Sequence, residues 1–94
     1  MGAYETIELT AIDKEIDSYI RQQLPQLEDA TLYAAEHQVV SGMNYKYSYR
    51  NGDQSTTVVV WDQPWTKLRQ ITSISKVEKT KNEAGQSIQR TTTT

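Results

Sequence analysis

The sequence contains no cysteine and a single histidine, His37, among its 94 residues. Without cysteine there can be no disulfide, no thiolate metal site and no cysteine nucleophile. One histidine with scattered carboxylates does not make a zinc site. Ser41 lies in the tripeptide Val-Ser-Gly rather than in the Gly-x-Ser-x-Gly turn of serine hydrolases. The sequence therefore predicts neither an enzyme nor a bound cofactor or metal.

Long apolar runs and an excess of basic residues are also missing, and the formal net charge is -2. We therefore expect no nucleic-acid partner and no membrane partner, because binding to nucleic acid or to an anionic membrane needs a basic surface. No stretch is apolar and long enough to cross a bilayer, and the first residues lack the pattern of a secretory signal. These absences favour a cytoplasmic location, with a secreted protein or an excised domain as the alternatives.

The length suffices for one domain, and the first half of that domain has helical periodicity. Thr10 has the character of a helix N-cap, and acidic residues follow it in the first turn. Pro25 would remove a hydrogen bond inside a helix, so we expect the helix to end near Leu24 or to kink there. Its apolar stripe consists of Ile12, Ile16, Tyr19, Ile20, Leu24 and Leu27.

Strand patterns replace the helical spacing from Thr31 onward. Residues 43–50 alternate between apolar and polar side chains without a break, which is typical of a half-buried strand. Asn51-Gly52 follows and predicts a type I′ hairpin turn. The return strand over residues 54–61 ends in four consecutive apolar residues, which indicates a central position in the sheet.

Three other segments have weaker patterns. Residues 3–9 are consistent with a brief strand, and residues 32–40 with a strand that is interrupted near Gln38. In residues 65–75 the apolar positions recur every third residue, which fits a strand with a bulge or a helix. The β-branched content favours the strand. Residues 77–94 are polar and are predicted to be a disordered tail.

These elements predict an α+β fold in which one helix packs on an antiparallel sheet of about four strands. We expect one face of this sheet to meet the helix and to supply most of the core. The side chains predicted to point toward the helix are Tyr33, Ala35, Tyr45, Tyr47, Tyr49, Val58, Val60, Leu68, Ile71 and Ile74.

Two joints between strands carry unusual residues for turns, which normally favour Gly, Pro, Asn, Asp and Ser. The first joint is Gln38-Val39-Val40-Ser41-Gly42, with a valine pair, and the second is Gln63-Pro64-Trp65, with a tryptophan behind proline. Either feature alone is explained more simply as a strand end or a core aromatic. In an antiparallel meander, however, alternate turns lie at the same end of the sheet. Two apolar tips side by side indicate a surface that binds another protein.

The joints also resemble those of a known family. Gln38-Val39-Val40-Ser41-Gly42 resembles the Q-V-V-A-G loop of cystatins, with serine in place of alanine. Asn44-Tyr45 follows it, as in many stefins, and Val60-Trp61 with Pro64-Trp65 is similar to the second half of plant cystatins. The resemblance covers roughly residues 10–75, although the helix signature of plant cystatins is absent.

The resemblance implies a cystatin-like domain over residues 1–76, with residues 77–94 as the tail. It further implies a reversible, tight-binding competitive inhibitor of papain-like cysteine proteases of the papain and cathepsin type. In this family the N-terminal segment and two loops plug the active-site cleft. The residues that would contact the protease are Gly2, Ala3, Gln38, Val39, Val40, Ser41, Gly42, Pro64 and Trp65.

Two alternatives stay open at this point. A binding module or scaffold of the same fold without inhibitory activity is favoured slightly by the very short segment before Gly2. The second alternative concerns assembly. We expect a monomer, but the stiff Val39-Val40 pair in a tight turn suggests a domain-swapped dimer as a second state.

Overall fold

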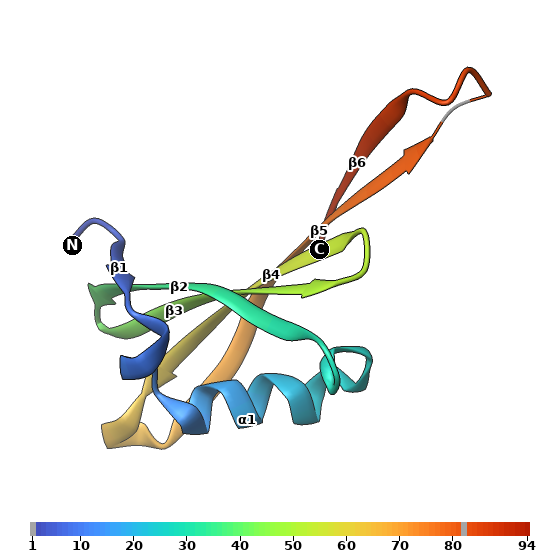
Figure 1. The fold of residues 1–94 in the computed structure, drawn as a ribbon. Helices are drawn as coiled ribbons and strands as arrows, with labels where there is room; N and C mark the ends of the chain where they lie inside the picture. The colour runs from blue at the N-terminus through green and yellow to red at the C-terminus, as the bar shows by residue number, and fades with distance from the viewer. Residues whose placement is uncertain (1, 82) are drawn as a thin grey trace.

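The computed structural model describes residues 2–81 and 83–94 as one antiparallel sheet with a single helix packed across one face (Figure 1). The strands follow one another in the sheet in chain order, from β1 to β6, so each pairs with its neighbour in sequence. Their bounds are β1 Glu5–Ile7, β2 Thr31–Val40, β3 Gly42–Asn51, β4 Gln54–Gln63, β5 Leu68–Lys81 and β6 Ser87–Thr93. The predicted α+β class is confirmed, with six strands in the described residues in place of about four.

The helix α1, Lys14–Gln23, begins later than the sequence predicts. The predicted cap, Thr10, lies in a short 3-10 turn, and Asp13 is the N-cap. The Asp13 carboxylate accepts a hydrogen bond of 2.9 Å from the backbone amide of Glu15, which satisfies one of the free amides at the helix start. The predicted end near Leu24 is confirmed, because Pro25 opens a separate 3-10 turn. None of the helices in the described part of the chain could span a membrane.

The core lies between α1 and the face of the sheet that α1 covers. Of the side chains predicted to face the helix, Ala35, Tyr47, Tyr49, Val58 and Val60 are buried, and Tyr45 and Ile71 pack at the margin of the core. Leu68 and Ile74 are half-buried. The rest of the core comes from the helix and the loop after it, through Ile16, Ile20, Leu27 and Ala30.

Tyr33 is a correction to the predicted core. The pairing of β2 with β3 shifts between Leu32 and Ala34, so Tyr33 is the extra residue of a bulge. Leu32 packs against the core instead, while Tyr33 is 38% exposed. Its ring lies 4.5 Å from the guanidinium of Arg50. A bulge changes which residues face inward, and the alternation pattern alone did not reveal it.

The strand joints also differ in detail from the predictions. Strand β2 runs to Val40 without the interruption expected near Gln38. Asn51 pairs with Gln54, so the turn residues are Gly52 and Asp53. Gly52 has a φ of 61°, and Asp53 has no positive φ, which is the pattern of a type II′ turn rather than type I′. The bulge expected in residues 65–75 is confirmed at the register shift of β4 against β5.

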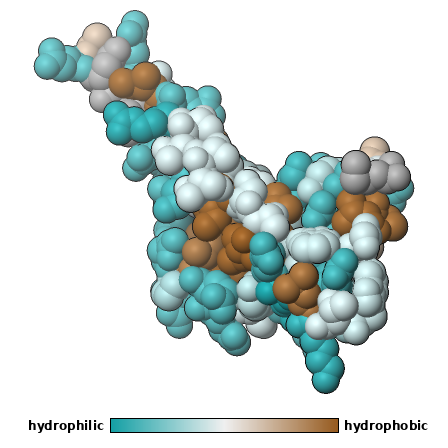
Figure 2. All heavy atoms as spheres, turned by 180° about the vertical axis from the view of Figure 1, so that it is seen from behind, coloured by the Kyte–Doolittle hydropathy of each residue, from teal (hydrophilic) through white to brown (hydrophobic). Residues whose placement is uncertain are grey.

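The last part of the described chain forms a hairpin of β5 and β6 that extends away from the helix (Figures 1 and 2). The sequence predicts disorder from Val77 onward, but there β5 continues to Lys81 and pairs with β6. All β6 side chains are exposed, so backbone hydrogen bonds and not apolar burial hold this strand. Composition therefore gave no signal for it. The division of the chain at residue 77 stays a prediction.

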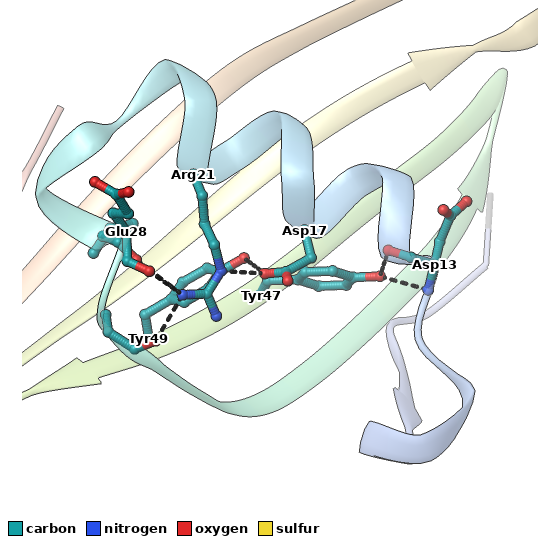
Figure 3. Close-up of polar contacts among 8 residues, drawn as sticks. Asp13, Asp17, Arg21, Glu28, Tyr47 and Tyr49 are labelled. Atoms are coloured by element: carbon teal, nitrogen blue, oxygen red, sulfur yellow. Dashed lines mark hydrogen bonds and ion pairs between the residues drawn. The ribbon is translucent and has the colours of Figure 1, made fainter.

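Two buried tyrosines connect the sheet to the helix (Figure 3). The Tyr47 hydroxyl accepts a hydrogen bond of 3.0 Å from the backbone amide of Asp13, and the Tyr49 hydroxyl donates one of 2.6 Å to the Asp17 carboxylate. Arg21 binds the same carboxylate at 3.0 Å. Burial raises the pKa of Tyr47 to about 12. Burial and then the hydrogen bond to Asp17 raise the pKa of Tyr49 as well.

Arg21 also fixes the loop that follows α1. Its Nη1 donates to the backbone carbonyl oxygens of Leu27, Glu28 and Ala30, at 3.0, 3.1 and 2.7 Å. The guanidinium also lies 5.0 Å from the centre of the Tyr49 ring. The Arg21 side chain thereby fixes the positions of the helix, the sheet and the chain leading into β2 relative to one another.

Candidate functional site

Three segments that are distant in sequence lie at one end of the sheet. They are residues 2–3, the β2–β3 turn at residues 39–42, and the β4–β5 joint at Pro64–Thr66, and we call them the loop edge. Figure 1 shows them on the side of the sheet opposite to the β3–β4 turn and the β5–β6 hairpin. The meander order therefore places the two predicted joints side by side, as the sequence implied.

The first tip of the loop edge is a very tight turn. Val39 pairs with Met43 and Val40 with Gly42, which leaves Ser41 alone at the apex. Val39 is 63% exposed, so an apolar, β-branched side chain points into solvent. Gly42 has a φ of 96°, and a Cβ atom there would overlap the carbonyl oxygen of Asp62. The turn therefore requires glycine, both for its backbone conformation and for the close approach of β4.

The second tip is the 3-10 turn Pro64–Thr66. Pro64 stands at its start, where the fixed φ of proline fits a helical turn and the missing amide has no partner to lose. Lys67 closes the turn with a φ of 56°. Trp65 is 66% exposed, so the indole lies on the surface and not in the core.

The N-terminal segment lies against the first tip. The backbone amide of Gly2 donates to the Val39 carbonyl at 3.2 Å, and the Gln38 side chain donates to the Gly2 carbonyl at 2.8 Å. Asn44 in turn donates to the Gln38 side chain at 3.1 Å. Gly2 and residues 39–41 line a shallow hollow of about 270 Å³. The Gln38 side chain therefore holds the N-terminal segment in place and is not part of an exposed tip.

The end of β4 lies beneath both tips, and sequence reasoning did not assign it a role. The Trp61 indole donates to the Ser41 carbonyl at 2.9 Å. The Gln63 side chain also contacts Ser41, and it accepts a hydrogen bond from Thr66 in the second tip. The signal available in the sequence was the period-two spacing of residues 61 and 63, which places them on one face of β4.

An ion pair lies on the opposite face of β4, beside the helix. The buried Asp62 carboxylate accepts a hydrogen bond of 2.9 Å from Arg69, its partner on β5. Arg69 also lies 3.9 Å from Glu15. The hydrogen bond to Asp62 raises the pKa of Arg69. This ion pair joins β4 to β5 at the base of the turn that carries Trp65. The spacing of the charged residues in the sequence did not indicate the pair.

The chemistry of the loop edge is that of a contact surface. Its exposed large apolar side chains are Val39 and Trp65, and the described residues include no group of three or more His, Asp or Glu side chains that could hold a metal. His37 lies on β2, and its Nε2 is 3.9 Å from the Glu5 carboxylate. The residues predicted to contact a protease lie at this edge, except Gln38, whose side chain bonds to Gly2 and Asn44 beside it. Their role in binding stays a prediction.

Comparison with known proteins finds one curated protein with a similar sequence. No family model matches the chain, and no solved structure matches it. The chain is 36% identical over 63 residues to Cysteine proteinase inhibitor 5 of Arabidopsis thaliana, a plant cystatin. The match covers 62% of this chain and 52% of the relative, so the chain spans about half the length of the curated relative that it matches. This similarity confirms the resemblance to the cystatin superfamily.

Proposed function

We propose that this chain, as a protein of the cystatin superfamily, inhibits papain-like cysteine proteases reversibly by inserting the loop edge into the active-site cleft. The observation that carries the proposal is the position of two exposed apolar tips and the N-terminal segment at one end of a rigid sheet. Val39 and Trp65 are 63% and 66% exposed and lie on neighbouring tips, and apolar side chains gathered on one exposed surface indicate a contact with another protein.

Each segment of the loop edge has a role in this proposal. Val39, Val40 and Ser41 lie along the primed side of the protease cleft, next to the catalytic cysteine. Pro64 and Trp65 contact an apolar patch beside it, and residues 2–3 approach the non-primed side. These assignments follow the resemblance to cystatins. The hydrogen-bonded geometry supports them, because preformed tips lose little conformational entropy on binding.

The same geometry explains why the chain would act as an inhibitor and not as a substrate. A protease cleaves a segment that it can hold in an extended conformation. The Ser41 apex is a tight turn between paired residues, and its carbonyl oxygen already accepts hydrogen bonds from Trp61 and Gln63. Attack at this carbonyl would require these contacts to break first. We therefore expect the protease to bind the chain without cleaving it.

Titration of papain with the purified chain tests the proposal. We expect one-to-one inhibition that competes with substrate and reverses on dilution, with the chain intact by mass spectrometry after long incubation. A chain that leaves papain activity unchanged at high micromolar concentration would instead be a non-inhibitory binding module of this fold. The structure describes one chain, so the monomer and the domain-swapped dimer both stay predictions.

Replacement of Trp65 by alanine is expected to weaken papain binding by about 2 kcal/mol, which is roughly a 30-fold rise in the inhibition constant. The indole is the largest exposed apolar group of the loop edge, and its burial in the complex would be lost. Ile88→Ala is the matched control, because Ile88 is 48% exposed on the distant β6 strand. An inhibition constant for Trp65→Ala equal to that of the control would remove Trp65 from the binding surface.

A further inference from the structure

We propose that Gln63 is a positioning residue that ties the two tips of the loop edge to each other, with Trp61 in a supporting role. Gln63 is not among the residues that the loop motifs implicate in binding. The proposal deepens the proposed function, and the part of it that concerns inhibition rests on that function.

The side-chain amide of Gln63 contacts both tips at once. Its Nε2 donates to the carbonyl oxygen and to the hydroxyl of Ser41, at 3.3 Å each. Its Oε1 accepts from the Thr66 hydroxyl at 3.1 Å. A primary amide carries a donor and an acceptor on the same planar group, which is what a bridge between these two partners needs. A lysine could supply only the donor, and a carboxylate only the acceptor.

The surroundings of Gln63 fit this role. Trp61 lies two residues earlier on the same face of β4 and donates a second hydrogen bond to the Ser41 carbonyl. The Cγ of Gln63 would lie 3.0 Å from a Cβ atom at Gly42, so the absence of a side chain at Gly42 makes room for the Gln63 stem. Thr66 also donates to the Gln63 backbone carbonyl at 3.2 Å.

The two tips otherwise belong to separate turns. The first joins β2 to β3 and the second joins β4 to β5, so their relative position depends on strand pairing and on contacts across β4. Binding of both tips in one cleft requires them to keep a fixed spacing. A tie that sets this spacing before binding reduces the ordering that the complex must impose.

The test compares Gln63→Met with the wild-type chain and with Gln26→Met. Methionine keeps the length of the side chain but removes both hydrogen-bonding ends. Gln26 is exposed in the turn after α1, so its replacement changes the same atoms away from the loop edge. We expect backbone order parameters from ¹⁵N relaxation to fall at Ser41, Gly42 and Trp65 in Gln63→Met and to stay unchanged in Gln26→Met.

Gln63→Glu separates the two halves of the tie. A carboxylate still accepts from Thr66, but it repels the Ser41 carbonyl oxygen. Order should therefore fall at Ser41 and Gly42 and persist at Trp65. Unchanged order at both tips in Gln63→Met would overturn the proposal, and so would equal loosening of both tips in Gln63→Glu.

Inhibition supplies the functional measurement. We expect Gln63→Met to raise the papain inhibition constant about tenfold, mainly through faster dissociation, and Gln26→Met to leave it unchanged. If the wild-type chain does not inhibit papain, the proposed function fails. The order parameters of the free protein then still decide whether Gln63 ties the tips, because they require no protease.

Discussion

Replacement of Gly42 by alanine is expected to lower the free energy of unfolding by about 3 kcal/mol and to abolish tight inhibition of papain. The backbone φ of 96° disfavours any side chain at this position. In addition, the new Cβ would overlap the Asp62 carbonyl oxygen, which belongs to the backbone of β4 and cannot rotate away. Relief of the overlap requires β3 to move from β4, and this movement displaces the Ser41 apex from Trp61 and Gln63.

Gly52→Ala is the matched control for this prediction. Gly52 has a φ of 61°, but nothing lies within 4 Å of the place where a Cβ would stand. Its replacement is therefore expected to cost about 1 kcal/mol, from the left-handed backbone alone. The β3–β4 turn lies at the other end of the sheet, so inhibition should not change. Urea unfolding and papain titration of both variants make the comparison. Equal losses of stability would show that the contact with Asp62 is unimportant.

Alkaline solution is expected to destabilise the protein steeply, by about 4 kcal/mol between pH 10 and pH 12. In the unfolded chain, tyrosines lose their protons near pH 10. In the folded protein, burial raises the pKa of Tyr47 to about 12, and the pKa of Tyr49 is also raised, first by burial and then by its hydrogen bond to Asp17. Above pH 10 the unfolded state therefore binds fewer protons than the folded state.

This difference in bound protons sets the direction in which the free energy of unfolding changes with pH. Stability is fully present below the unfolded pKa and falls as the pH rises toward the folded pKa, by about 1.4 kcal/mol per pH unit for each tyrosine. Urea unfolding followed by circular dichroism at a series of pH values measures the slope. Tyr49→Phe should remove roughly half of it, because one of the two buried hydroxyls is then gone. A free energy of unfolding that stays constant up to pH 12 would contradict the raised pKa of Tyr47 and of Tyr49.

Much of the scaffold could be predicted because its signals are local. The apolar stripe of α1 and the alternation in β3 follow from which side chains must be buried, and each is visible in a window of about ten residues. The position of the two joints at one end followed from chain order alone, since alternate turns of a meander share an end. The resemblance to cystatins rested on the residues of these joints, and the similarity to a plant inhibitor agrees with it.

Other features escaped prediction for identifiable reasons. The alternation pattern placed Tyr33 in the core. A bulge in β2 turns this residue to the other face of the sheet, and a bulge depends on the pairing of two strands. Strand β6 was predicted to be disordered, because composition reports apolar burial and this strand is held by backbone pairing with β5. Asp13, and not Thr10, is the N-cap, because Thr10 lies in a separate 3-10 turn; the backbone amide of Asp13 also donates to the Tyr47 hydroxyl from the sheet.

The class of the fold, the location of its core and the apolar character of the two tips could be predicted from the sequence alone, since burial periodicity and turn chemistry are properties of neighbouring residues. The contacts that hold the tips in place became visible only in the folded chain. The contacts of Gln63 with Ser41 and of Asp62 with Arg69 join different strands and turns of the chain. Such contacts exist only once the register of the whole sheet brings their atoms within hydrogen-bonding distance.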